Sequence, residues 1–237
     1  IVVRDIDQWF VILTCEQDVQ NIANRKPDIG IDVGIEKLAT LSDGSIIDNP
    51  RYLVKSQRKL GKQQRWLSRK KKGSKRRVRQ RIRVAKIHRK IRRQRDDFLH
   101  KTSYYLANNF GKIVFEQLNI QGMIKNHCLA KAISDVSWYK LMQYTTYKVG
   151  KTGGSVEYVD AKNTSQNCSG CGKKVKKTLA DRTHCCPYCG LVMDRDENAA
   201  INIKSRAGSV QTDYAHGDSV RLNASPNRQS VEQLSVK

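Results

Sequence analysis

The sequence predicts an α/β protein with a mixed β-sheet, interrupted by a long basic helical insertion and by an inserted four-cysteine metal-binding segment. Short apolar runs that are typical of strands alternate along the chain with segments of helical periodicity. Residues 51–95 contain 22 Lys or Arg and no Asp or Glu. Five of the seven cysteines lie between Cys168 and Cys189, which favours metal binding over disulfides.

Composition indicates an anionic partner. The chain has 45 Lys plus Arg against 22 Asp plus Glu, a formal net charge of +23. Self-repulsion of this size destabilises a compact state without counter-charge, so a polyanion is the expected partner. A membrane surface is the weaker alternative, because the sequence has no long apolar span and no lipidation motif. The sequence shows no signal peptide, which predicts a cytoplasmic location.

The first predicted strands lie in residues 1–20, which are rich in β-forming residues and resemble a final hairpin of a preceding domain. The chain begins with Ile1 rather than Met, so we expect an N-terminally truncated protein. Residues 29–34 predict a buried strand that carries Asp32. Residues 35–41 and 45–48 predict two more strands, with a hairpin turn between them.

The basic segment predicts two helices on either side of residues 73–74, within an insertion that spans residues 51–110. In the second helix, one apolar stripe is expected to pack and the other faces to remain free for phosphates. The stripe comprises Val84, Ile87, Ile91, Phe98 and Tyr105. The expected nucleic-acid contacts are Arg58, Lys62, Arg65, Arg69, Lys75, Arg76, Arg79, Arg83, Lys86 and Arg89. A merely solvated charged face is the alternative, which the absence of interleaved acids disfavours. Trp66 is a candidate for base stacking or for packing.

The remaining elements are a strand at 112–118 that carries Glu116, an amphipathic helix at 135–150, a strand at 154–159 and a helix that begins near Asp194. From residue 207 to residue 237 the chain is polar and lacks periodicity, which predicts a disordered tail.

The cysteines form two Cys-x-x-Cys pairs, each followed by Gly, with 14 residues between the pairs. Cysteines at this spacing place both sulfurs of one turn on the same ion, and two such turns predict a zinc ribbon. The predicted ligands are Cys168, Cys171, Cys186 and Cys189, with Cys185 as an alternative to Cys186. Four thiolates leave no open position for water, so this zinc is expected to be structural.

Three acids stand in similar settings: Asp32 and Glu116 on predicted strands, and Asp196 at a predicted helix start. Buried carboxylates require a partner, which is either Lys or Arg, or a divalent ion such as Mg²⁺ or Mn²⁺. Three converging acids can hold two ions about 4 Å apart for phosphodiester cleavage. Asp194 competes with Asp196 for the third place. The order of strands and acids along the chain is the ribonuclease H-like arrangement.

These motifs, in this order, resemble those of the TnpB (OrfB) proteins of bacterial insertion sequences, relatives of the type V CRISPR effector nucleases. The resemblance covers roughly residues 20–206 and rests on Ile31-Asp32-Val33-Gly34, Leu38-Ala39-Thr40, Phe115-Glu116-Gln117-Leu118, Thr164-Ser165-Gln166, both cysteine pairs, Asp194-Arg195-Asp196, Asn198-Ala199-Ala200 and Asn202-Ile203.

The resemblance implies a RuvC-like nuclease domain (residues 21–160 and a final helix at 194–206) that a zinc ribbon (residues 161–193) interrupts. It also implies a guide RNA, a DNA target cut with Mg²⁺ at Asp32, Glu116 and Asp196, and a place at the prokaryotic nucleoid. Residues 1–20 correspond to the last strands of the family's N-terminal barrel. The alternatives are a non-cleaving nucleic-acid-binding module and a transposase that joins DNA strands.

Overall fold

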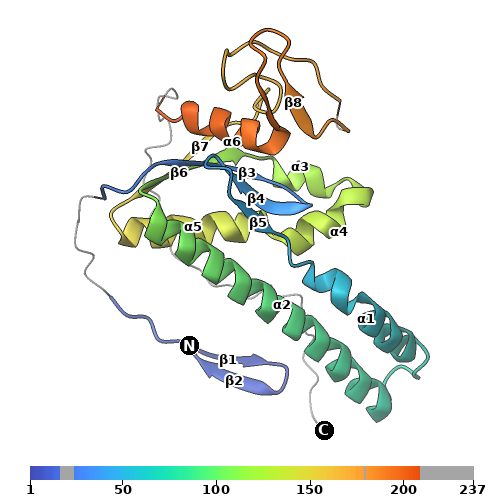
Figure 1. The fold of residues 1–237 in the computed structure, drawn as a ribbon. Helices are drawn as coiled ribbons and strands as arrows, with labels where there is room; N and C mark the ends of the chain where they lie inside the picture. Colours follow the sequence, from blue (N-terminus) through green and yellow to red (C-terminus); the bar gives the residue numbers. More distant parts are fainter. Residues whose placement is uncertain (17–23, 179, 209–237) are drawn as a thin grey trace. The chain divides into compact units, whose positions relative to one another are not determined.

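The computed structural model describes residues 1–16, 24–178 and 180–208, and residues Ile1–Ala207 form one compact unit. Its centre is a five-stranded mixed sheet in the order β5-β4-β3-β6-β7 (Figure 1). These strands are β3 (Ile29–Val33), β4 (Lys37–Leu41), β5 (Ile46–Asp48), β6 (Lys112–Gln117) and β7 (Ser155–Asp160). The strands predicted near residues 29–34, 35–41, 45–48, 112–118 and 154–159 therefore form.

Helices cover both faces of this sheet. The helices α2 (Lys75–Asn109) and α5 (Trp138–Lys151) pack on one face, and α6 (Arg195–Ser205) packs on the other (Figure 1). Alternate residues of a strand point to opposite faces. Accordingly Ile113 and Phe115 join the core beneath α2 and α5, whereas Val114 packs with Ile203 of α6. The strands β3 and β6 are buried on both sides, as their apolar sequences require.

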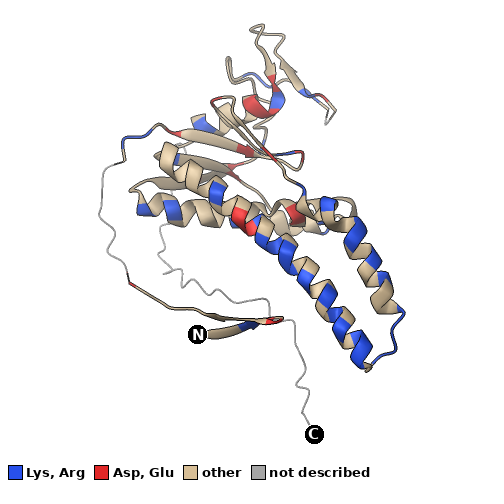
Figure 2. Ribbon diagram, turned by 60° about the horizontal axis from the view of Figure 1, so that its bottom comes forward, with Lys and Arg blue, Asp and Glu red and all other residues tan. Residues whose placement is uncertain are grey.

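The basic insertion forms two long helices, α1 (Tyr52–Ser68) and α2, along which Lys and Arg are concentrated (Figure 2). Ser74 begins α2 as its N-cap, and its hydroxyl accepts a hydrogen bond from the Arg77 N–H at 3.2 Å. Near the turn that connects the two helices, the Gln80 amide donates to the backbone carbonyl and to the side chain of Gln63 at 3.0 and 2.8 Å.

The buried stripe of α2 follows the prediction only in its first half. Val84 and Ile91 are buried, but Phe98 is only half-buried and Tyr105 is 46% exposed. Leu99 and Leu106 are fully buried instead. The predicted positions repeat every seven residues, whereas the buried side rotates around this helix because the first half packs against α1 and the second half against α5.

The amphipathic helix predicted at 135–150 is divided in two. Ser137 adopts a left-handed backbone conformation with φ 58°, so it ends α4 (His127–Val136) and precedes α5. Directly after this break, the Trp138 indole N–H donates to the Gly34 carbonyl at 3.1 Å. Short α3 (Ile120–Ile124) and α4 were not predicted from the sequence.

Two smaller sheets lie outside the central one. The strands β1 (Val2–Asp5) and β2 (Gln8–Val11) form a hairpin whose turn residue Asp7 pairs with Lys86 and Arg89. The strands β8 (Thr183–Cys185) and β9 (Val192–Asp194) form the second hairpin, in the cysteine-rich segment. The barrel strands were predicted for residues 1–20, of which residues 17–20 lie outside the described part of the chain. The tail was predicted for residues 207–237, of which residues 209–237 lie outside it. No described helix has the length and apolarity needed to cross a membrane.

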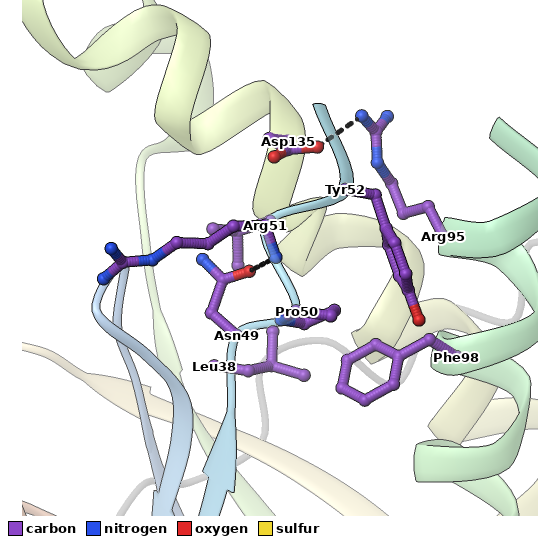
Figure 3. Close-up of a pocket in the computed structure, with 9 residues that line it drawn as sticks. Leu38, Asn49, Pro50, Arg51, Tyr52, Arg95, Phe98 and Asp135 are labelled. Atoms are coloured by element: carbon purple, nitrogen blue, oxygen red, sulfur yellow. Dashed lines mark hydrogen bonds and ion pairs between the residues drawn. The ribbon is translucent and has the colours of Figure 1, made fainter. Parts of the chain in front are cut away.

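The basic helices join the sheet at a small pocket lined by Leu38, Asn49, Pro50, Arg51, Tyr52, Arg95, Phe98, Asp135 and Val136 (Figure 3). Asp135 of α4 lies between both basic helices. Its Oδ1 pairs with Arg95 of α2 at 2.7 Å, and its Oδ2 accepts from the Leu53 N–H, at the start of α1, at 3.3 Å. One buried carboxylate thus fixes three helices together.

Replacing Asp135 by Ala is therefore expected to destabilise the fold by about 3–5 kcal/mol, because it leaves the largely buried Arg95 guanidinium without its counter-charge. Thermal unfolding measures the change. Asp97→Ala is the matched control, since its ion pair with Lys101 is exposed and should leave the melting temperature within about 1 °C of the parent. Equal losses in the two variants would contradict the role of Asp135.

Candidate functional site

The three predicted carboxylates come from β3, β6 and α6. The strands β3 and β6 pair in parallel with Ile31 opposite Phe115, so the next residues, Asp32 and Glu116, are neighbours across the strands. Ile31 and Phe115 belong to the core beneath α2 and α5. Asp32 and Glu116 therefore project from the opposite face of the sheet, which α6 covers.

Close packing brings α6 onto β3. A Cβ at Gly30 would lie 2.2 Å from the Ala200 carbonyl oxygen and 2.6 Å from the Lys204 backbone nitrogen, so only glycine fits there. Asp196 lies in the first turn of α6, four residues before Ala200 and hence on the same side of the helix. Gly30 thereby determines how closely Asp196 approaches the strand that carries Asp32.

Within this carboxylate cluster (Asp32, Glu116 and Asp196), the charges of Glu116 and Asp196 act on Asp32, and Asp196 also pairs with Arg195 at 3.2 Å. Burial raises the pKa of Asp32 well above its usual value, and the negative charges of Glu116 and then Asp196 raise it further. Burial also raises the pKa of Glu116, although a hydrogen bond from the Thr164 hydroxyl and the charge of Arg206 partly offset it. A bound dication would relieve this repulsion.

Asp194 has a different role from Asp196. It is the N-cap of α6, and its Oδ1 accepts from the backbone N–H groups of Asp196 and Glu197 at 2.8 and 3.3 Å. Its Oδ2 pairs with Lys37 at 3.2 Å. Burial opposes ionisation, but these partners prevail and lower the pKa of Asp194. The carboxylate of Asp194 is thus committed to the cap, and Asp196 acts more strongly than Asp194 on the charge of Asp32.

The four predicted zinc ligands meet at one point. The sulfurs of Cys168, Cys171, Cys186 and Cys189 all lie within 4.8 Å of one another. The Cys168–Cys189 and Cys171–Cys186 pairs are each 3.6 Å apart. A tetrahedral zinc site with bonds of about 2.3 Å requires sulfurs about 3.8 Å apart, which these two pairs nearly match. The four cysteines can therefore hold a metal such as zinc.

Local backbone geometry prepares the thiolates. Gly172 and Gly190 have φ of 73° and 75°, and their N–H groups bond the carbonyls of Cys168 and Cys186 at 2.8 and 3.0 Å. Burial disfavours the Cys186 thiolate, but backbone N–H groups of Cys189 and Tyr188 outweigh burial and lower the pKa of Cys186 to about 6.

The other cysteines behave differently. The Leu191 N–H favours the Cys189 thiolate, yet hydrogen bonding with Cys186 and then burial outweigh it and raise the pKa of Cys189 to about 12. A bound metal ion would displace the protons of these thiols. Cys185 is exposed and lies outside the group, whereas Cys186 is buried within it.

Nine of the ten predicted basic contact residues lie on α1 and α2, and the tenth, Arg69, is the C-cap of α1. All except Arg89 are exposed. Arg89 is the exception: its side chain is 11% exposed, pairs with Asp7 at 2.8 Å and donates to the Asp5 carbonyl. Lys86 remains exposed but also pairs with Asp7, at 2.6 Å. Trp66 is 41% exposed, and the Lys62 ammonium lies 5.1 Å from its ring centre.

Sequence reasoning missed three residues that contact the acids: Thr164, Lys37, and Arg195, whose guanidinium pairs with Asp196 at 3.2 Å. Thr164 donates its hydroxyl proton to Glu116, and Lys37 pairs with Asp194. A signal for Thr164 was present, because it lies in the Thr164-Ser165-Gln166 segment just before the first cysteine. Lys37 gave no comparable signal among so many lysines.

Two family models match the chain: "Probable transposase" (OrfB_IS605) over residues 12–127, and "Cas12f1-like, TNB domain" over residues 138–203. A Streptomyces pristinaespiralis protein called "Putative RNA-guided DNA endonuclease" is 39% identical over 225 residues, covering 94% of this chain and 54% of that protein. InsQ of Escherichia coli K12, which bears the same description, is 31% identical over 244 residues, covering 96% and 60%.

Among solved structures, the cryo-EM structure of a Cas12f1–sgRNA–target DNA complex matches with a TM-score of 0.55 and 19% identity, covering 88% of this chain and 56% of that one. This likeness shows a common fold. The chain spans little more than half the length of the curated relatives that it matches. Two family models and these relatives together show that the chain belongs to the TnpB (OrfB) family.

Proposed function

We propose that this chain is the nuclease part of a transposon-associated, RNA-guided DNA endonuclease that cuts phosphodiester bonds by two-metal-ion catalysis. The observation that carries the proposal is the placement of Asp32 and Glu116 on the face of the sheet that α6 covers, with the charges of Glu116 and of Asp196 on α6 both acting on Asp32. Residues 21–160 and 194–206 then form a ribonuclease H-like (RuvC-like) domain, and residues 161–193 a zinc ribbon. The parallel neighbours β3 and β6, with α6 packed on them, support this assignment.

The chain's own residues prepare the site for divalent ions. When bound, Mg²⁺ or Mn²⁺ supplies an activated water and stabilises the charge on the leaving oxygen. Asp32 and Glu116, on adjacent parallel strands, would hold such ions from the sheet, and Asp196 would hold them from α6. Oxygen donors of this kind suit both ions. The apolar core beneath the sheet excludes water from that side of the site.

The cysteine ribbon is proposed to hold zinc in a structural role. All four ligands are thiolates, so no position remains for a reacting water. DNA target and guide RNA are the proposed partners, and the cytoplasm, at the nucleoid, is the proposed location. The names of the curated relatives and the nucleic acids in the Cas12f1 structure support these partners. A basic surface that follows backbone shape suits a nuclease in which base pairing selects the sequence.

The exposed arginines of α2 should dominate nonspecific affinity for nucleic acid. Replacing Arg76, Arg79 and Arg83 by Ala is expected to weaken binding to duplex DNA and to reduce the salt slope by up to about 0.9 log units for each phosphate that the variant no longer neutralises. Fluorescence anisotropy at several salt concentrations measures both quantities. The control replaces Lys125, Lys131 and Lys162, exposed residues outside the basic helices. Equal losses of affinity in both variants would show a net-charge effect without a defined surface.

Cleavage tests the proposed function. The chain, purified with RNA transcribed from its own transposon end, is incubated in Mg²⁺ with DNA that matches the guide. We expect cleavage that Asp32→Ala abolishes and Asp97→Ala retains. Binding without cleavage in Mg²⁺ and Mn²⁺ would overturn the nuclease proposal in favour of a nucleic-acid-binding module. Joined rather than cut DNA ends would favour a strand-joining transposase.

A further inference from the structure

The loop of residues 161–169, which we call the bridging loop, leads from β7 to the first cysteine turn and contacts Glu116. Thr164 lies in this loop and is only 4% exposed. Its hydroxyl donates to Glu116 Oε1, and the Ala161 carbonyl, at 3.1 Å, is the other acceptor within reach. A hydroxyl has one proton, so donation to the carboxylate is favoured when Glu116 is charged.

Two asparagines of α6 hold this loop from the other side. Asn202 donates its amide protons to the carbonyls of Thr164 and Asn167 at 2.8 and 2.7 Å. Asn198 lies one helical turn earlier, is fully buried, and donates to the Asn167 carbonyl at 2.8 Å. These buried side-chain amides are paired with carbonyls of the bridging loop, so they hold the loop in one position on α6. Any other position would leave buried polar groups without hydrogen-bond partners.

The same asparagines connect the loop to the cysteine cluster. The Asn198 side-chain oxygen accepts from the Ser169 N–H at 2.9 Å, and Ser169 lies between the ligands Cys168 and Cys171. This hydrogen bond joins the first cysteine turn to α6. Asn198 follows Asp196 by two residues on α6, so the contact also locates the third carboxylate.

We infer that Thr164 is a positioning residue for Glu116, and that Asn198 and Asn202 transmit the folded state of the cysteine ribbon to the carboxylate cluster. The folded cysteine ribbon would thus determine how the carboxylate cluster binds divalent ions, although the metal held by the cysteines is not part of that cluster. This inference rests on the proposed function for its catalytic consequence, but the contacts themselves can be tested without cleavage.

Valine matches the shape of threonine and lacks the proton that reaches Glu116. In Thr164→Val, Glu116 Oε1 therefore loses its donor in a buried place, which costs more than a hydrogen bond between neutral groups. Serine retains the hydroxyl and removes only a methyl group. The Val and Ser variants together separate donation to Glu116 from simple packing of the loop.

The first test is a double-mutant cycle on thermal unfolding of the full chain with its ribbon metal bound and no Mg²⁺ or Mn²⁺ present. Thr164→Val should lower the melting temperature in the parent and have a clearly smaller effect in a Glu116→Leu background, with a difference of about 3 °C or more. Additive changes would overturn the inference.

The second test measures Mn²⁺ affinity from the EPR signal of the free ion, without nucleic acid, alongside zinc content by elemental analysis. Thr164→Val should bind Mn²⁺ about tenfold or more weakly with unchanged zinc, and Thr164→Ser should bind within about twofold of the parent. Asn202→Ala should also weaken binding, and should add little to Thr164→Val because both act through Thr164.

The inference is overturned if Thr164→Val binds Mn²⁺ as the parent does, or if Thr164→Ser is no better than Thr164→Val. Its failure differs from failure of the proposed function. A parent that binds Mn²⁺ and shows the coupling between Thr164 and Glu116, yet cuts no DNA in the presence of its guide, would refute the proposed nuclease and retain the bridging loop's role.

Discussion

Replacing Cys186 by Ser is expected to remove the bound zinc and to unfold the ribbon, whereas the same change at its neighbour Cys185 should leave zinc content near one ion per chain. Both thiols lie on the same short segment, but Cys186 is buried among the ligand sulfurs and Cys185 is exposed outside them. Binding of a structural zinc is worth about 10–16 kcal/mol in small zinc domains, so losing one ligand removes most of the ribbon's stability.

Elemental analysis measures the zinc, and hydrogen exchange measures the ribbon. In the Cys186→Ser protein, the amides of β8 and β9 should exchange much faster than in the parent, while those of β3 and β6 should remain protected. The hairpin of β8 and β9 has short strands that bury few apolar side chains of their own, so little besides the metal orders it. Zinc bound equally by both serine variants, or absent from the parent, would contradict the assignment.

Asp32→Asn should have opposite effects on stability and on divalent-ion binding. We expect its melting temperature in Mg²⁺- and Mn²⁺-free buffer to exceed that of the parent by several degrees, because the variant removes a charge that burial and neighbouring carboxylates destabilise. The gain should be on the order of 1 kcal/mol or more. Differential scanning calorimetry in a buffer without strong chelators measures it and leaves the ribbon metal in place.

The pH dependence gives the sign of this effect. The pKa of Asp32 is raised in the folded state, so below its unfolded value of 3.8 the residue is neutral in both states and costs nothing. As pH rises above that value, ionisation favours the unfolded chain, and the penalty grows until the folded pKa is passed. The advantage of Asp32→Asn should therefore be absent in strong acid and full at neutral pH.

Divalent ions should reverse the order of the two proteins. Mn²⁺ at 100 times its dissociation constant stabilises a folded protein by about 2.7 kcal/mol, and only the parent retains the full carboxylate cluster. Asp97→Asn, at an exposed position, serves as the control and should resemble the parent with and without Mn²⁺. A melting temperature of Asp32→Asn below that of the parent in metal-free buffer would contradict the electrostatic account.

The sequence alone determined the features that depend on local geometry. Cysteines two residues apart share one turn wherever that turn lies, so the sequence could predict which four cysteines come together, and their sulfurs meet as expected. The central strands and basic helices follow from periodicity and composition over a few residues. The family resemblance likewise rests on short motifs, and the comparisons confirm it.

The tertiary structure decided what depends on contacts between distant segments. Only parallel pairing of β3 with β6 places Asp32 beside Glu116, and only close packing at Gly30 brings α6 toward them. The sequence left Asp194 and Asp196 as competitors, and the structure shows that Asp194 caps α6 and pairs with Lys37. The buried side of α2 also depended on which helices pack against it. Strand pairing and helix packing of this kind cannot be predicted from local sequence, because they are stabilised by contacts between distant segments that form only in the folded chain.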